Sequence, residues 1–185
     1  MRRSMILLTP LLLLGMHRSS LAQVHVSNLT RVDEAIESQI NEVTPEWESH
    51  SVQPASVDGL IPNDKVRIRQ WTSKGRNVRV AIVQHQSEEE ATSALRQFAV
   101  DKKTNSRLLG FGDEAYVWGI RGSIAFRRGN LTVYVTAVVI KEVDAAEASK
   151  DIDEARQKTE RSERDEEAVV TRGFAQKVAA VLATF

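Results

Sequence analysis

The sequence predicts an α+β fold, in which an antiparallel five-stranded sheet is covered on one face by helices in the order α-β-β-α-β-β-β-α. Two observations support this prediction. Apolar residues recur every three or four positions in three segments, as in amphipathic helices, and alternate with polar residues in five others, as in half-buried strands. Short turns rather than helices join most of the strands, which favours hairpins and an antiparallel sheet.

The first helix is predicted over about residues 30–43, because its apolar residues are spaced three, four, four and three apart: Leu29, Val32, Ile36, Ile40 and Val43. Residues 44–62 contain three prolines, and we expect them to form an irregular connector on the surface, with Trp47 as an anchor.

Two strands, residues 65–71 and 78–82, are predicted by alternation on either side of Gly75. We favour a connecting loop of odd length because it places the apolar residues on one face, Val66, Ile68, Val80 and Ile82. The opposite face then carries Arg67, Arg69, Trp71 and Arg79. A loop of even length would mix the charged residues with the valines.

Residues 87–90 (SEEE) form a capping box that begins a second helix, which runs to about Asp101. Three strands follow at about 115–118, 123–128 and 131–140, and Gly129-Asn130 is a two-residue hairpin turn between the last two. This register places Ile124, Phe126, Val133 and Val135 on one face. The other face receives Arg127, Thr132, Tyr134 and Thr136.

Residues 141–167 are rich in both charges and poor in large apolar residues, so no buried face is expected there. From Ala168 an apolar stripe predicts a C-terminal packing helix: Val170, Phe174, Val178, Val181 and Phe185. The two parts together could form one long helix with a protruding charged end, which would be able to dock a partner.

The first 22 residues have the features of a secretory signal peptide. Two arginines precede an apolar run of eleven residues, 6–16, and Ser20 and Ala22 are small residues suited to a signal-peptidase cut. We expect residues 23–185 to form a single exported α+β domain, periplasmic or extracellular in a bacterium. The alternatives are an uncleaved membrane anchor and export through the twin-arginine route.

Charge and composition exclude several classes of function. The chain has 25 basic residues, 25 acidic residues and no cysteine, and removal of the leader leaves 22 basic against 25 acidic residues, a net charge of −3. Disulfides, thiolate metal sites and cysteine nucleophiles are excluded, and general nucleic-acid binding is disfavoured. The three histidines after the leader lack the spacing of a metal site, so we expect neither metal nor cofactor.

A glycine-rich segment formally matches a known nucleotide-binding motif. Residues 110–115 (GFGDEA) match a dinucleotide fingerprint, but no strand precedes them and two acids would repel a pyrophosphate. We therefore expect a tight turn that leads into a strand. His85 together with Asp113 and Glu114 is the alternative hypothesis, a small secreted hydrolase.

The predicted non-core sheet face suggests a ligand site, because arginines interleaved with aromatic rings can hold anionic groups. Its residues are Arg67, Arg69, Trp71, Arg79, Arg127 and Tyr134. The expected partners are an anionic glycan, a lipid headgroup or an acidic envelope protein. The competing interpretation is an ordinary solvated face whose arginine stems lie over the rings.

The motifs Gly112-Asp113-Glu114-Ala115-Tyr116 and Phe126-Arg127-Arg128-Gly129-Asn130, a valine-rich strand and an apolar C-terminal helix resemble small exported bacterial domains of unknown function. The resemblance covers about residues 65–185. It implies an α+β domain in the cell envelope and names no catalytic residues. With the preceding observations, it favours a non-catalytic binding or structural module.

Overall fold

The computed structural model describes residues 28–53, 63–104, 106–141 and 152–185. It contains one antiparallel sheet of six strands, ordered β1-β2-β3-β6-β5-β4. The strands are β1 (Glu48–Val52), β2 (Val66–Ser73), β3 (Arg76–Gln84), β4 (Glu114–Trp118), β5 (Ser123–Arg128) and β6 (Leu131–Val139). The helices are α1 (Leu29–Val43), α2 (Glu88–Asp101) and α3 (Ile152–Leu182), with a short 3-10 turn, η1, at Asn63–Lys65.

The α+β class and the antiparallel sheet are confirmed, but the predicted number of strands is wrong. The sixth strand is β1, which lies in the segment expected to be irregular and pairs with β2 along its whole length. Its sequence, ESHSV, lacks an apolar alternation because no side chain of β1 is fully buried. The predicted anchor before it is confirmed, since Trp47 is buried with its ring centroid 4.9 Å from that of Phe174.

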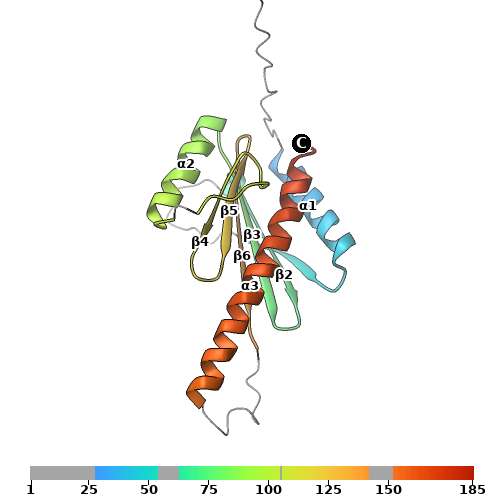
Figure 1. The fold of residues 1–185 in the computed structure, drawn as a ribbon. Helices are drawn as coiled ribbons and strands as arrows, with labels where there is room; N and C mark the ends of the chain where they lie inside the picture. Colours follow the sequence, from blue (N-terminus) through green and yellow to red (C-terminus); the bar gives the residue numbers. More distant parts are fainter. Residues whose placement is uncertain (1–27, 54–62, 105, 142–151) are drawn as a thin grey trace, which may run out of the picture.

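The prediction that helices cover one face only is also wrong. Helices α1 and α3 lie together on one face of the sheet, and α2 lies on the other (Figure 1). Beneath α2, Leu95 and Ala99 pack against Tyr116 and Ala125 in a second, smaller core. This arrangement explains why β5 is buried on both faces along most of its length.

The turn between β2 and β3 reverses the predicted distribution of residues on the sheet. Lys74 and Gly75 form a two-residue turn, closed by the pair Ser73 and Arg76, and both turn residues have positive φ angles, 38° and 75°. Such turns match the twist of a hairpin. The loop is therefore even, and the favoured odd loop is wrong. Arg67, Arg69 and Trp71 lie opposite Ile82, Val80 and Val78, on the face covered by α1 and α3.

The register predicted for the β5–β6 hairpin is confirmed. Gly129 and Asn130 connect the pair Arg128 and Leu131, and the predicted apolar residues all enter the main core: Ile124, Phe126, Val133 and Val135. Arg127, Thr132 and Tyr134 lie on the face that α2 occupies. The sequence sufficed here because glycine and asparagine specify the turn and both strands alternate clearly.

Helix α3 is one long helix of 31 residues, as proposed, and its N-terminal part extends beyond the sheet (Figure 1). Its C-terminal half buries Phe174, Val178 and Leu182 in the main core. The charged segment does contain a buried residue, contrary to expectation: Glu167 is fully buried, pairs with Arg121 and accepts a hydrogen bond from the backbone of Val139. The predicted leader and residues 142–151 lie outside the described part of the chain.

Candidate functional site

Arg69 holds helix α1 against the sheet instead of facing solvent. Its guanidinium donates to Asp33 at 2.6 and 3.1 Å and pairs with Glu37 at 2.5 Å. The side chains of Arg69 and Asp33 are each 10% exposed. Although burial opposes it, hydrogen bonding and charge from Asp33 and Glu37 raise the pKa of Arg69. A guanidinium so enclosed has little capacity left for a ligand.

Trp71 and Arg67 join the same polar contact between α1 and the sheet. The indole Nε1 of Trp71 donates to Asn41 at 3.1 Å, and Asn41 donates to Ser49 at 3.3 Å. Arg67 donates to the hydroxyl of Thr30 at 3.1 Å. The sequence does contain an indication of this network, because Asp33, Glu37 and Asn41 are four residues apart and therefore share one face of α1.

Arg127 is buried at the start of α2, where it joins three segments. Its Nη1 lies 2.8 Å from Glu88, 3.1 Å from Asp113 and 3.1 Å from the carbonyl oxygen of Gly129. Asp113 in turn accepts from Arg128 at 3.1 Å and from the amide of Gly129 at 2.8 Å. This cluster fixes the glycine-rich turn and the β5–β6 turn against α2.

The glycine-rich turn is a tight turn into a strand, as expected from the sequence. Gly112 has a φ of +58°, and a Cβ placed on it would lie 2.1 Å from the carbonyl oxygen of Arg127. The amide of Asp113 donates to that same carbonyl at 2.8 Å. Only glycine fits so close an approach with this backbone conformation.

His85 and Glu114 are occupied by separate partners. His85 Nε2 lies 2.9 Å from the hydroxyl of Thr132, and burial lowers the pKa of His85, with partial opposition from Glu90. Glu114 pairs with Arg96 at 3.2 Å and accepts from the Tyr116 hydroxyl at 2.7 Å.

Burial alone would raise the pKa of Glu114, but hydrogen bonds from Tyr116 and Arg96 hold it below its usual value. Among the hydrogen bonds and ion pairs of the described residues, none connects His85 with Asp113 or Glu114.

Within the described ranges, helices leave part of one face of the sheet uncovered, and Arg79 and Tyr134 lie there. Three cross-strand rows run over β1, β2, β3 and β6 on the side of α2, and we call them the open face. The rows are Glu48-Thr72-Asn77-Val138, His50-Gln70-Arg79-Thr136 and Val52-Ile68-Ala81-Tyr134. None of these side chains is fully buried, whereas most residues on the opposite side of the same strands are.

Helix α2 borders the open face at one corner only. The ring of Tyr134 meets that of Phe98 at 4.9 Å, and Phe98 meets Trp118 at the same separation. Burial raises the pKa of Tyr134. Of the six residues expected to form one ligand face, the structure therefore brings together Arg79 and Tyr134, places Arg127 under α2, and moves the other three to the opposite side.

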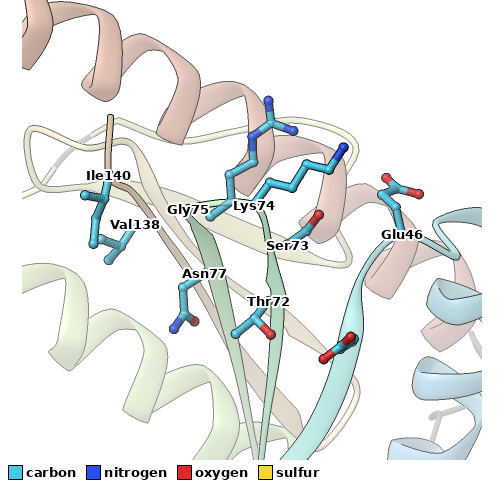
Figure 2. A pocket seen from close by; sticks show the side chains of 10 residues that line it. Glu46, Thr72, Ser73, Lys74, Gly75, Asn77, Val138 and Ile140 are labelled. Atoms are coloured by element: carbon cyan, nitrogen blue, oxygen red, sulfur yellow. The ribbon is translucent and has the colours of Figure 1, made fainter. Parts of the chain in front are cut away.

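A cavity of about 610 Å³ opens at the end of the open face beside the β2–β3 turn (Figure 2). It is lined by one complete row of the open face and by Glu46, Ser73, Lys74, Gly75, Arg76 and Ile140. Glu46 lies on one side of it, and the apolar side chains of Val138 and Ile140 lie on the other (Figure 2).

The charges around this cavity are unequally satisfied. Arg76 and Lys141 both pair with Glu166 at 2.7 Å, and these contacts lower the pKa of Glu166 despite some burial. Glu46, Glu48 and Lys74 have no charged partner within the described ranges. The cavity wall thus offers two carboxylates and one ammonium group beside an apolar surface.

Comparisons with known proteins add no relative: no protein-family model matches the chain, and neither a curated protein nor a solved structure gives a match. The resemblance to small exported bacterial domains therefore stays a prediction. In the part of the chain that the structure describes, no three His, Asp or Glu side chains are grouped to hold a metal ion. No helix there combines the length and the hydropathy of a membrane span.

Proposed function

We propose that the protein is a non-catalytic binding module of the cell envelope that holds its partner on the open face. The unequal covering of the sheet carries this proposal. Among the described residues, two helices bury one face, whereas α2 covers only part of the other and leaves three cross-strand rows without a covering helix. Binding sites are typically clefts or cavities, and the cavity of about 610 Å³ lies at the end of this face.

The chemistry of the open face favours a protein segment over a glycan or a lipid headgroup, without the acidic character expected from the sequence. An anionic glycan or a lipid headgroup would need several cationic groups together. Arg79 is the exposed arginine of the open face, whereas Arg69 and Arg127 are enclosed by carboxylates. Apolar residues such as Ile68 and Val138 alternate with charged ones, which suits a polypeptide with side chains of both kinds.

The candidate residues of the hydrolase alternative serve other contacts. Asp113 and Glu114 each accept hydrogen bonds from arginines, and the lowered pKa of Glu114 makes that carboxylate a weak general base. His85 is hydrogen-bonded to Thr132, and neither Asp113 nor Glu114 takes part in that contact.

Site-specific photo-crosslinking in cells that naturally produce the protein tests the proposal. A photoreactive amino acid replaces Arg79 on the open face or, as a matched control, the exposed Arg172 of α3. We expect a protein adduct from position 79 and none from position 172, and we expect Val138→Arg to abolish the adduct. A glycan or lipid adduct would refute the choice of partner, and equal labelling at both positions would refute the open face as the site.

A further inference from the structure

The two outer strands of the sheet differ in how their free edges are treated. The outer edge of β4 is paired, because the amide of Leu108 donates to Ala115 and that of Val117 donates to Ser106, both at 3.0 Å. A bridge between Arg107 and Tyr116 completes this pairing. Strand β1 is the other edge of the sheet, and within the described residues it pairs with β2 alone.

An edge strand presents a row of unpaired backbone donors and acceptors, and proteins usually protect it by keeping it short or with charged side chains (above all lysine), proline, a bulge or a covering segment. The charged residue of β1 is the acid Glu48. The sequence of β1, ESHSV, contains neither lysine nor proline, and its register with β2 is regular over five pairs. The strand is also held firmly in place. Ser49 donates to Glu37 at 2.7 Å and accepts from Asn41 at 3.3 Å, so β1 is attached to α1 as well as to β2.

The charges at this edge indicate what would pair with it. Glu46 and Glu48 stand at the beginning of β1 without a charged partner in the described ranges, and residues 46–52 contain no lysine or arginine. Oppositely charged residues that face each other across two strands stabilise the pairing, and like charges oppose it. A basic strand would therefore be preferred over an acidic one.

A second copy of this chain would not satisfy these carboxylates. Antiparallel pairing of β1 with itself about His50 would place Glu48 opposite Val52 of the copy. Because the segment has no lysine or arginine, two copies would bring four carboxylates to one edge without a guanidinium or ammonium partner.

We propose that β1 is a docking edge, on which an extended segment of a partner protein pairs as a seventh strand and places a lysine or arginine beside Glu48. This inference rests on the proposed function and specifies how the partner would bind. Main-chain hydrogen bonds to the edge would supply affinity, and the carboxylates of Glu46 and Glu48 would supply the preference for a basic sequence. Glu48 also belongs to the open face, so the edge and the face form one continuous surface.

Amide hydrogen exchange of the isotopically labelled full chain, followed by NMR, tests the proposal with three capped peptides. The first is Thr-Lys-Val-Lys-Val-Lys-Thr. The second replaces lysine with glutamate, and the third replaces valine with proline, which preserves the charge but prevents strand pairing. At a concentration about twice its dissociation constant, the first peptide should slow exchange of the free β1 amides about threefold. The other two peptides should leave these rates unchanged.

Two variants separate the charge contribution from unfolding. Glu46→Gln/Glu48→Gln should remove the protection, whereas the control Glu34→Gln/Glu42→Gln, on exposed positions of α1, should retain it. Absence of protection by the first peptide at millimolar concentration, or equal protection by the proline peptide, would overturn the docking edge. Protection that rises with protein concentration without peptide would show self-pairing and overturn the basic partner. If crosslinking from position 79 succeeds while β1 stays unprotected, the proposed function stands and the edge assignment fails.

Discussion

The buried contact of Arg69 with Asp33 and Glu37 provides the most direct test of whether the predicted ligand arginines are structural. Replacement of Asp33 by alanine removes two of the hydrogen bonds that the guanidinium makes, at 2.6 and 3.1 Å, and leaves the pair with Glu37 at 2.5 Å. Because Arg69 stays enclosed, the variant retains a buried charge with an incomplete set of partners.

The size of the effect follows from these contacts. A hydrogen bond to a charged group contributes about 1.5–3 kcal/mol, so two of them give about 3–6 kcal/mol before any compensation. Glu37 continues to neutralise the guanidinium, which favours the lower end. We therefore expect Asp33→Ala to lower the free energy of unfolding by about 3 kcal/mol, equivalent to a fall of about 6–12 °C in Tm for a chain of this length.

Denaturant unfolding followed by tryptophan fluorescence measures this change, because Trp71 is fully buried beside the network. Arg79→Ala is the matched control and should cost less than about 0.5 kcal/mol, since Arg79 is exposed. The double variant Asp33→Leu/Arg69→Met removes the buried guanidinium as well and should recover part of the loss, because the remaining Glu37 is partly exposed and still accepts from Ser49. A loss below about 1 kcal/mol for Asp33→Ala would refute a structural role for the contact between Arg69 and Asp33. A double variant less stable than the single one would show that Arg69 also stabilises the fold through Glu37.

Three further predictions concern the glycine-rich turn and the two titrating residues beside α2. Gly112→Ala should destabilise the fold by more than about 2 kcal/mol in thermal unfolding, because the new Cβ would lie 2.1 Å from the carbonyl oxygen of Arg127. The control Gly110→Ala, whose Cβ would have no atom within 4 Å, should show only the smaller cost of its positive φ, and equal losses would contradict the close approach. Burial lowers the pKa of His85, so the free energy of unfolding should fall as the pH drops below the ordinary histidine pKa of about 6.5. His85→Gln should flatten this part of the pH profile of stability, and an unchanged slope would contradict the burial of a neutral His85. The pKa of Glu114 is also lowered, so its ionised form stabilises the fold above about pH 4.3, and this stabilisation is lost at lower pH. Glu114→Gln should make acid unfolding, followed by circular dichroism, less steep. An unchanged acid-unfolding curve would count against the contacts of Glu114 with Arg96 and Tyr116.

The local parts of the fold could be predicted from sequence because neighbouring residues determine them. The Gly129-Asn130 turn fixes its hairpin, and Ser87 caps α2 by accepting from the amide of Glu90. The Lys74-Gly75 turn was harder to predict, since it requires a positive φ at a lysine and places arginines among valines. That register is stable because α1 supplies carboxylates for Arg69, and such a partner is 36 positions away in the sequence.

The same limit applies to the candidate site. Sequence alternation identified the faces of individual strands, but the face that a helix covers depends on how distant segments pack. Helix α2 covers β5 because Leu95 and Ala99 fit against Ala125 and Tyr116, and this choice leaves the β1 side of that face uncovered. Strand β1 itself has too few apolar residues for detection, although it supplies one member of each row of the open face.

Among the described residues, the two edges of the sheet differ in whether a further strand could be added. At β4, residues 106–108 already occupy the edge, and a further strand would have to displace them. At β1, a seventh strand would continue the three rows, because side chains on paired strands align across a sheet. Its alternate residues would lie beside Glu48, His50 and Val52, so a carboxylate, an imidazole and an apolar side chain would each face one partner side chain. The order of residues along the partner strand would then determine how tightly it binds, whereas surface charge alone would not distinguish one basic sequence from another.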